Sequence, residues 1–292
     1  MILAAIDIGS NAARLLISEA SVYQDDHVDF TKLNLVRVPL RLGFDVFQHG
    51  LIHPSKKQAL IQTMKAYRLL MDIYQVEIFR ACATSALRDA GNKQEIIQAV
   101  KKATDISIEI ISGQEEASII YETQIAEKLD AHKSYLYIDV GGGSTEVTLF
   151  SNQSIVFKES FNIGTIRILQ NQVSDAQWEY MKACIKQAVR GLSPVQAIGS
   201  GGNINKVFSL SKKKEGKPLS LELLLDYYQE LSHTTIEERK HLYGFRDDRA
   251  DVIVPALFLY TSIMQWVNAT EILVPKIGLA DGIIKKLYRE NT

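Results

Sequence analysis

The residues Tyr137–Val147 read YIDVGGGSTEV, and this stretch decides the fold prediction. An apolar strand ends at Asp139, a run of glycines makes a tight turn, and two hydroxyl residues lead through Glu146 into a second apolar run. Glycines admit positive φ and let a ligand approach the backbone closely. Successive backbone N–H groups in such a turn form an anion nest, and phosphate is its usual occupant. The stretch therefore predicts a phosphate-binding turn between two strands.

The two carboxylates of this stretch predict a cation beside the phosphate. Asp139 and Glu146 would repel a phosphate unless a divalent cation lay between them. Hard cations such as Mg²⁺ take oxygen ligands and commonly bridge carboxylates to phosphates.

A second stretch near the N-terminus has the same form. Ala4–Asn11 reads AAIDIGSN, an apolar strand that ends in Asp7, a glycine and a hydroxyl residue. Asp7 and Asp139 are 132 residues apart (139 − 7). This repeat predicts two similar domains that face each other across a cleft, with one phosphate loop from each. We assign residues 1–128 and 129–292 to them and expect the terminal helix, 279–292, to pack back on the first.

Length and composition restrict the class of protein. The chain has 292 residues, 46% of them hydrophobic and 23% charged, which is typical of a soluble globular protein with two domains. The formal net charge of −1 provides no global basic field for nucleic acid or an anionic membrane. The sequence opens directly on a strand, without the basic region of a signal peptide, so a cytoplasmic location is expected.

The metal-binding and redox side chains are sparse. Cys82 and Cys184 are the only cysteines, and both stand in apolar surroundings without metal-ligand spacing. They predict two buried free thiols rather than a disulfide. The six histidines show no ligand spacing, so zinc is not implied.

Apolar periodicity and turn residues predict alternating strands and helices, with a meander of three strands at the start and a polar turn at Asp25–His27. Strands are expected at 2–8, 14–20, 28–40, 77–83, 107–111, 135–139, 146–150, 154–160 and 271–274, with a third strand-to-glycine turn at 196–203. Helices are expected at 54–74, 92–104, 112–129, 163–170, 175–190, 220–232, 236–243, 248–267 and from 278 onward. Asn92 is expected to cap the second of these helices, and a Ser or Gly cap is expected for the third. The fold class is α/β with two related domains.

Several motifs, in order along nearly the whole chain, resemble the exopolyphosphatase / guanosine pentaphosphate phosphohydrolase (Ppx/GppA) family. They are Ile6–Asn11, Ala83–Arg88, Ile111–Ala117, Asp139–Glu146, Gly199–Gly202 and Arg249–Pro255. The resemblance implies two ribonuclease-H-like domains of the actin, Hsp70 and sugar-kinase superfamily, with mixed sheets and the active site in the interdomain cleft. It implies a short, two-domain member that removes phosphate from a phosphate chain with Mg²⁺ or Mn²⁺. Dimers are frequent in that family, although no segment of this sequence indicates one.

The resemblance assigns the catalytic roles to Glu116 and Arg88. Glu116 matches the family's general base, which accepts the proton of the attacking water. The alternative is a first-turn glutamate that serves the helix dipole. Glu115 is expected to serve the dipole or to support the residues that contact the ligand. Arg88 matches a phosphate clamp, and its alternative is a surface ion pair with Asp89.

The remaining candidate residues bind phosphate or metal. Mg²⁺ ligands, direct or through water, are expected at Asp7, Asp139 and Glu146, although an aspartate at a strand end also serves turn or cap chemistry. The loop Gly199, Ser200, Gly201 and Gly202 holds distal phosphates or a nucleotide, or serves only close packing. The loop Lys212–Lys217 lines a polyanion channel or is simply solvated. Phosphates are expected to be cradled by Ser10, Asn11, Gly141, Gly142, Gly143, Ser144 and Thr145, and Ala12 departs from the family's usual Ser.

Three functions compete. The first is a phosphoanhydride hydrolase that releases terminal orthophosphate from inorganic polyphosphate or guanosine pentaphosphate by in-line attack of water. The second is an ATP-dependent small-molecule kinase of the same fold, and the third is a non-catalytic polyphosphate- or nucleotide-binding protein. The motifs at Ser112–Glu116 and Ala83–Arg88 favour the hydrolase.

Overall fold

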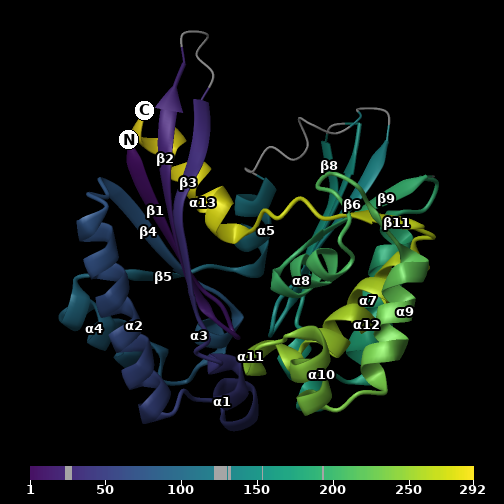
Figure 1. The fold of residues 1–292 in the computed structure, drawn as a ribbon, viewed down its shortest axis with the longest axis horizontal. Coiled ribbons are helices and arrows are strands. Elements are labelled where there is room, and N and C mark those ends of the chain that lie inside the picture. The colour runs from purple at the N-terminus through teal and green to yellow at the C-terminus, as the bar shows by residue number, and fades with distance from the viewer. Residues whose placement is uncertain (24–27, 122–129, 131–132, 153, 193) are drawn as a thin grey trace. The chain divides into compact units, whose positions relative to one another are not determined.

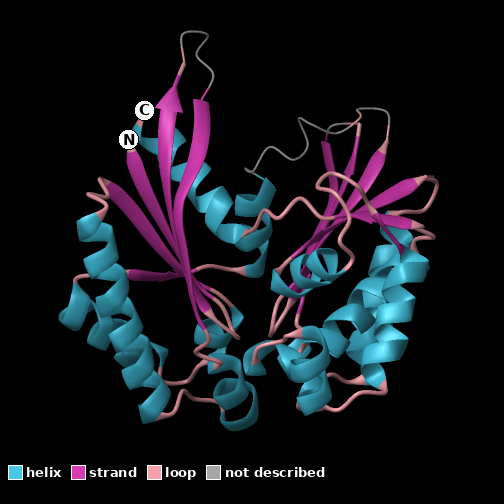
Figure 2. Cartoon of the chain, viewed as in Figure 1, coloured by secondary structure: helices cyan, strands magenta, loops and turns pink. Residues whose placement is uncertain are grey.

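The computed structural model describes residues 1–23, 28–121, 130, 133–152, 154–192 and 194–292. The chain forms two compact units, Met1–Thr123 with Gly278–Thr292, and Gln124–Ile277. Each unit is built on one mixed sheet flanked by helices (Figures 1 and 2). The expected division at residues 128 and 129 falls outside the described residues.

The first unit contains a five-stranded sheet in the order β3-β2-β1-β4-β5. Its first three strands are antiparallel neighbours, whereas β4 and β5 run parallel to β1, so the predicted meander at one side of a mixed sheet is confirmed. Leu3–Ile8 of β1 is buried throughout, as expected of a central strand covered on both faces. The strands are β1 (Ile2–Ile8), β2 (Ala13–Val22), β3 (Val28–Val38), β4 (Ile78–Ala83) and β5 (Ile108–Ile110).

Helices cover both faces of this sheet. The helices α2 (Pro54–Ile73) and α4 (Lys93–Thr104) pack together on one face. On the other face α13 (Leu279–Asn291) packs on β1 and β2 and against α5 (Gly113–Tyr121) (Figure 1). The C-terminal helix therefore belongs to the first unit, beside the helix that carries Glu116.

The sheet of the second unit has six strands in the order β10-β11-β9-β6-β7-β8. Its strands β8, β7, β6, β9 and β11 repeat the arrangement of β3, β2, β1, β4 and β5, with the same antiparallel and parallel neighbours. The repeat expected from the two Asp–Gly turns is therefore confirmed at the level of the sheets. The strands are β6 (Ser134–Val140), β7 (Thr145–Ser151), β8 (Ser154–Phe161), β9 (Val195–Ser200), β10 (Leu219–Ser220) and β11 (Glu271–Leu273).

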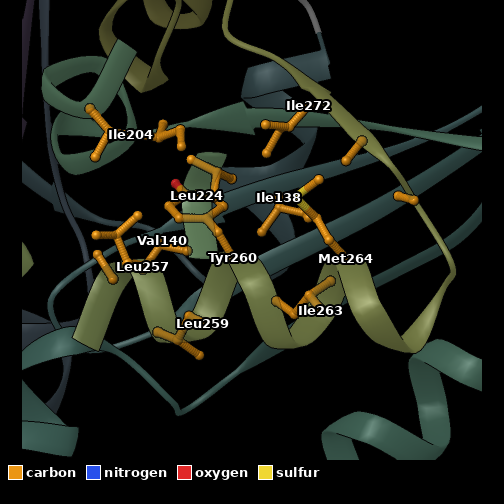
Figure 3. Close-up of a cluster of buried hydrophobic side chains, with 14 of the residues drawn as sticks. Ile138, Val140, Ile204, Leu224, Leu257, Leu259, Tyr260, Ile263, Met264 and Ile272 are labelled. Atoms are coloured by element: carbon orange, nitrogen blue, oxygen red, sulfur yellow. The ribbon is translucent and has the colours of Figure 1, made fainter. Parts of the chain in front are cut away.

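The core of the second unit is organised around α12 (Ile253–Trp266). This helix packs against β6 and against four helices, as its almost wholly apolar sequence predicts. In Figure 3, Tyr260 and Leu257 of α12 lie close to Val140 of β6 and Leu224 of α9. Its neighbours are α6 (Thr165–Leu169), α7 (Asp175–Ala188), α8 (Gly202–Leu210) and α9 (Leu221–Ser232); α10 (Ile236–Tyr243) and α11 (Asp247–Ala250) precede it.

The helix expected at 248–267 is two helices, and that expectation was wrong. The helix α11 ends at Ala250, and α12 begins at Ile253. Pro255 lies in the first turn of α12, where its missing N–H costs nothing. In one continuous helix the same proline would have broken the hydrogen-bond ladder. Three short elements were not predicted at all: α1 (Leu42–His49), α3 (Ser85–Asp89) and β10.

Smaller expectations also differ from the structure. Asn92 stands at the N-cap of α4, but its side chain binds the backbone N and O of Ile52 instead, at 3.0 and 2.9 Å. Both thiols are free, as expected. Cys82 is buried, whereas Cys184 is only half-buried. The turn at Asp25–His27 and the continuation of a helix to 129 lie outside the described residues. Within the described part of the chain, no helix has the length and apolar character needed to cross a membrane.

Candidate active site

In the first unit, the candidate residues follow three parallel strands at one edge of the sheet. Thr84 N donates to Ile8 O at 3.1 Å, and Ile111 N donates to Ala83 O at 3.1 Å, so the carboxyl ends of β1, β4 and β5 lie side by side. The segments that carry Ser10, Arg88 and Glu116 leave these strands. Ligands of open α/β sheets bind beyond the carboxyl ends of the strands. The structure thus brings these three segments to an edge suited to a ligand.

Backbone and hydroxyl bonds hold the first loop rigid. Gly9 N donates to Ala12 O at 3.0 Å and closes the turn. Gly43 N, in the unpredicted helix α1, donates to Ser10 O at 2.8 Å. The buried hydroxyl oxygens of Ser10 and Ser85 lie 2.8 Å apart. Sequence reasoning therefore missed both α1 and Ser85 as supports of the loop.

Asp7 forms an ion pair that the sequence analysis did not anticipate. It lies directly opposite Arg14 on β2, and Arg14 Nη1 is 2.9 Å from Asp7 Oδ2. The side chain of Asp7 is only 6% exposed. One oxygen of this expected metal ligand is therefore already bound by a guanidinium group.

Arg88 lies beside the segment that leads to Glu116. Its Nη1 donates to Ile111 O at 3.1 Å. Its Nε is 3.9 Å from Asp89 Oδ1, which is longer than a hydrogen bond. The guanidinium is thus tied to the backbone at the end of β5 rather than closely to Asp89.

The first turn of α5 carries two neighbouring glutamates, Glu115 and Glu116. Ser112 Oγ accepts a hydrogen bond from Glu115 N at 3.1 Å, which confirms the expected serine cap. Glu115 pairs with Arg80 of β4 at 3.1 Å, a partner that the sequence did not reveal. Glu116 is half-buried, and its Oε2 is shielded from solvent. The two neighbouring glutamates therefore have different environments.

The turn in the second unit repeats the geometry of the first. Gly141 N donates to Ser144 O at 2.9 Å, the counterpart of the bond from Gly9 N to Ala12 O. Asp139 lies directly opposite Glu146, as Asp7 lies opposite Arg14. The repeat is therefore exact in register, but one hairpin carries an arginine where the other carries a glutamate.

Polar bonds fix the residues that follow this turn. Glu146 is 2% exposed and accepts a hydrogen bond of 2.7 Å from Ser160 Oγ on β8. Thr145 Oγ1 donates to Ile163 O at 2.6 Å. The hydroxyl of Thr145 thus holds the turn to the segment before α6.

The three glycine carbonyls of the turn all accept hydrogen bonds from the first turn of α6. Gly141 O accepts from Thr165 N at 3.1 Å, and Gly142 O accepts from Ile166 N at 2.8 Å. Gly143 O accepts from Arg167 Nε at 2.7 Å.

The loop Gly199–Gly202 lies beside Asp139. A Cβ on Gly199 would lie 2.8 Å from Ile272 Cδ1, so this glycine serves close packing between β9 and β11. Gly201 has φ +110°, and a Cβ there would lie 3.1 Å from Asp139 Oδ1. The loop therefore approaches the carboxylate closely because it carries no side chain.

Two side chains of the second unit hold this loop in place. Tyr260 is fully buried, and its hydroxyl donates to Ser200 O. Burial raises the pKa of Tyr260, and the negative charge of Asp139 raises it further. Arg249 Nη1 donates to Gly202 O at 2.6 Å.

Comparison with known proteins identifies the family. The model of the Ppx/GppA phosphatase family matches residues 21–290. The chain belongs to this family. A crystal structure of an exopolyphosphatase from Cytophaga hutchinsonii matches with a TM-score of 0.85 and 25% identity, over 99% of this chain and 98% of that chain. The expected fold, two ribonuclease-H-like domains of the actin-like superfamily, is therefore confirmed for this Ppx/GppA protein.

Two curated relatives are longer than this chain. A guanosine-5'-triphosphate,3'-diphosphate pyrophosphatase of Aeromonas salmonicida is 24% identical over 306 aligned residues, which cover 99% of this chain and 60% of that protein. A bifunctional 3-dehydroquinate synthase/phosphatase of Fusobacterium nucleatum is 37% identical over 175 residues, 57% of this chain and 26% of that protein. The chain thus spans less than two thirds of either relative.

Two carboxylates of this Ppx/GppA chain could hold a divalent cation. Among the described residues, no group of three or more His, Cys, Asp and Glu side chains is arranged to hold a metal. Asp139 and Glu146 nevertheless form a carboxylate pair on one face of the sheet. Mg²⁺ is commonly bound by one or two carboxylates, with waters and substrate phosphates completing its shell. The donor set of the second unit fits such an ion.

Proposed function

We propose that the chain is a phosphoanhydride hydrolase that releases terminal orthophosphate from inorganic polyphosphate, guanosine pentaphosphate, or both. One observation carries the proposal. The segments that carry Ser10, Arg88 and Glu116 follow adjacent parallel strands and lie at one edge of the sheet. Membership of the Ppx/GppA family and the names of the relatives support this choice of substrates.

Phosphate binding is assigned to the two Asp–Gly turns and to Arg88. Transfer of a phosphoryl group depends on positioning and on neutralisation of charge, since the protein has little covalent chemistry to perform. Backbone N–H groups of the glycine turn, with Ser10 and Asn11, bind phosphate oxygens. Arg88 forms charge-assisted bonds to the phosphoryl oxygens, and these bonds strengthen as negative charge develops.

Glu116 is assigned as the general base. Its carboxylate orients the attacking water and accepts its proton, an effect of roughly 10²–10⁴-fold in rate. Arg80 pairs with the neighbouring Glu115 at 3.1 Å, so Glu115 is held in an ion pair. Glu116 is chosen over Glu115 because it matches the catalytic glutamate of the family.

Asp139 and Glu146 would hold Mg²⁺ or Mn²⁺, and the bound ion would neutralise charge on the phosphate chain. Asp7 has one carboxylate oxygen in its bond to Arg14, so any contribution to the metal would come from the other oxygen. A homodimer remains part of the proposal on the strength of the family resemblance, and a cytoplasmic location remains part of it as an expectation from the sequence.

Measurement of orthophosphate release from four substrates tests the proposal. We expect release from long polyphosphate, short polyphosphate or guanosine pentaphosphate in the presence of Mg²⁺, and little from ATP. Transfer from ATP only when a small-molecule acceptor is added would support the kinase instead. Tight binding of polyphosphate without release from any substrate would support a binding protein.

A further inference from the structure

The segment Gly164–Arg167 determines which way the glycine turn of the second unit faces. It supplies one donor to each of three successive carbonyls, those of Gly141, Gly142 and Gly143, at 3.1, 2.8 and 2.7 Å. A Cβ on Gly164 would lie 2.5 Å from the carbonyl carbon and oxygen of Gly142, so the two backbones are in direct contact. The carbonyl side of the turn is therefore covered by this segment.

Peptide geometry then fixes the direction of the N–H groups. A trans peptide is planar, and its C=O and N–H point in opposite directions. With the glycine carbonyls bound to the segment at α6, the N–H groups of Gly142, Gly143 and Ser144 point to the opposite side of the turn. Successive N–H groups directed to one side form an anion nest.

Arg167 differs from the other two donors. Thr165 and Ile166 donate through their backbone N–H groups, which any residue but proline supplies. Arg167 donates through its side chain, so this third bond depends on the residue type. A guanidinium–carbonyl bond is charge-assisted, and hydrogen bonds in series polarise one another. A cation on Gly143 O therefore makes the N–H of Ser144 a stronger donor.

We propose that Arg167 is a positioning residue for the phosphate chain: through Gly143 O it orients and polarises the Gly143–Ser144 peptide, so that Ser144 N–H binds a phosphate oxygen. The inference rests on the proposed function, because it assumes that the turn binds phosphate. It assigns to Arg167 an effect on binding that passes through the peptide and not through direct contact with the ligand.

The test compares wild type, Arg167→Ala and the control Arg190→Ala, which removes an exposed arginine of the same unit. Calorimetry measures the affinity for inorganic tripolyphosphate, and the ¹H–¹⁵N NMR signal of Ser144 is followed at saturation. Loss of one hydrogen bond to a charged group corresponds to a tenfold or greater loss of affinity, roughly. We expect this loss of affinity in Arg167→Ala and not in Arg190→Ala. At saturation, tripolyphosphate should shift the Ser144 amide signal less in Arg167→Ala than in wild type. Millimolar guanidinium should restore the affinity of Arg167→Ala.

Three results would overturn the inference. If Arg167→Ala binds tripolyphosphate as tightly as wild type, Arg167 has no role in phosphate binding. Weaker binding with an unchanged Ser144 shift at saturation indicates direct contact with phosphate. Weaker binding with a lowered melting temperature and no rescue by guanidinium indicates a purely structural role. A wild type that binds tripolyphosphate but hydrolyses nothing contradicts the proposed function and leaves this test of Arg167 intact.

Discussion

Asp139 and Glu146 lie directly opposite each other on the antiparallel strands β6 and β7, so that two carboxylates share one face of the sheet. Like charges in directly opposed positions destabilise a sheet. The corresponding pair of the first hairpin, Asp7 and Arg14, carries opposite charges and forms an ion pair. An arginine thus occupies this position in the first hairpin and a glutamate occupies it in the second, where the cation proposed above would compensate for the opposed carboxylates.

Substitution Glu146→Gln should separate stability from metal binding. Without divalent cations, the variant should be as stable as wild type or more stable, by up to about 1 kcal/mol, because the repulsion is relieved. Gln keeps an oxygen that accepts the bond from Ser160. Added Mg²⁺ should raise the melting temperature of wild type more than that of the variant, since a ligand stabilises only the state that binds it.

Differential scanning fluorimetry with and without Mg²⁺ measures both effects. Glu271→Gln is the matched control, because it removes an exposed carboxylate from the same sheet. Equal stabilisation of wild type and Glu146→Gln by Mg²⁺ would show that Glu146 does not bind the cation.

Gly282→Ala should disturb the contact between α13 and α5. A Cβ at Gly282 would lie 2.1 Å from Ile119 O, so the two helices cannot keep their positions. Overpacking of this kind costs about 1–3 kcal/mol, against a gain of roughly 1 kcal/mol from the better helix propensity of alanine. We expect net destabilisation in urea unfolding and lower activity, since α5 carries Glu116. Gly278→Ala, with no atom within 4 Å of its Cβ, is the control and should change stability little.

Cys82 should make folding stability depend on alkaline pH. Burial raises the pKa of this thiol from 9.0 to about 12. As pH rises, the Cys82 thiol therefore loses its proton in the unfolded chain before it does so in the folded chain. Its contribution to the free energy of unfolding is complete below pH 9 and is lost as pH rises toward 12. Wild type should lose up to about 1.4 kcal/mol per pH unit more than Cys82→Ala in this window. Parallel stability curves for the two proteins in urea unfolding above pH 9 would refute the assignment.

The central strands and long helices were predictable because the local spacing of their apolar residues indicates which side chains are buried. The strand Ile2–Ile8 is a nearly continuous apolar run, and the helix from Pro54 has apolar residues at helical spacing. The short helix α1 was missed, because its placement depends on bonds to the loop at Ser10 and Asn11. Pro255 indicated the break before α12. The break was nevertheless missed, because the apolar run continues on both sides of Pro255 and resembles a single buried helix.

Candidate residues were found where a motif carries them and missed where a tertiary contact creates their role. Arg14 had a signal, since it follows Asp7 by the same interval that separates Glu146 from Asp139. Arg80 and Arg167 had none, because a strand arginine and a helix arginine are usually solvated. Their bonds to Glu115 and to Gly143 O arise only once β4 meets α5 and α6 meets the glycine turn.

Phosphate release by Glu116→Gln tests the central claim most directly. The variant and the control Glu115→Gln are compared with wild type on polyphosphate and guanosine pentaphosphate, with tripolyphosphate affinity measured alongside. The account predicts that Glu116→Gln lowers kcat by roughly 10²–10⁴-fold while binding is retained, and that Glu115→Gln loses much less. A Glu116→Gln protein that releases phosphate at nearly the wild-type rate would contradict it.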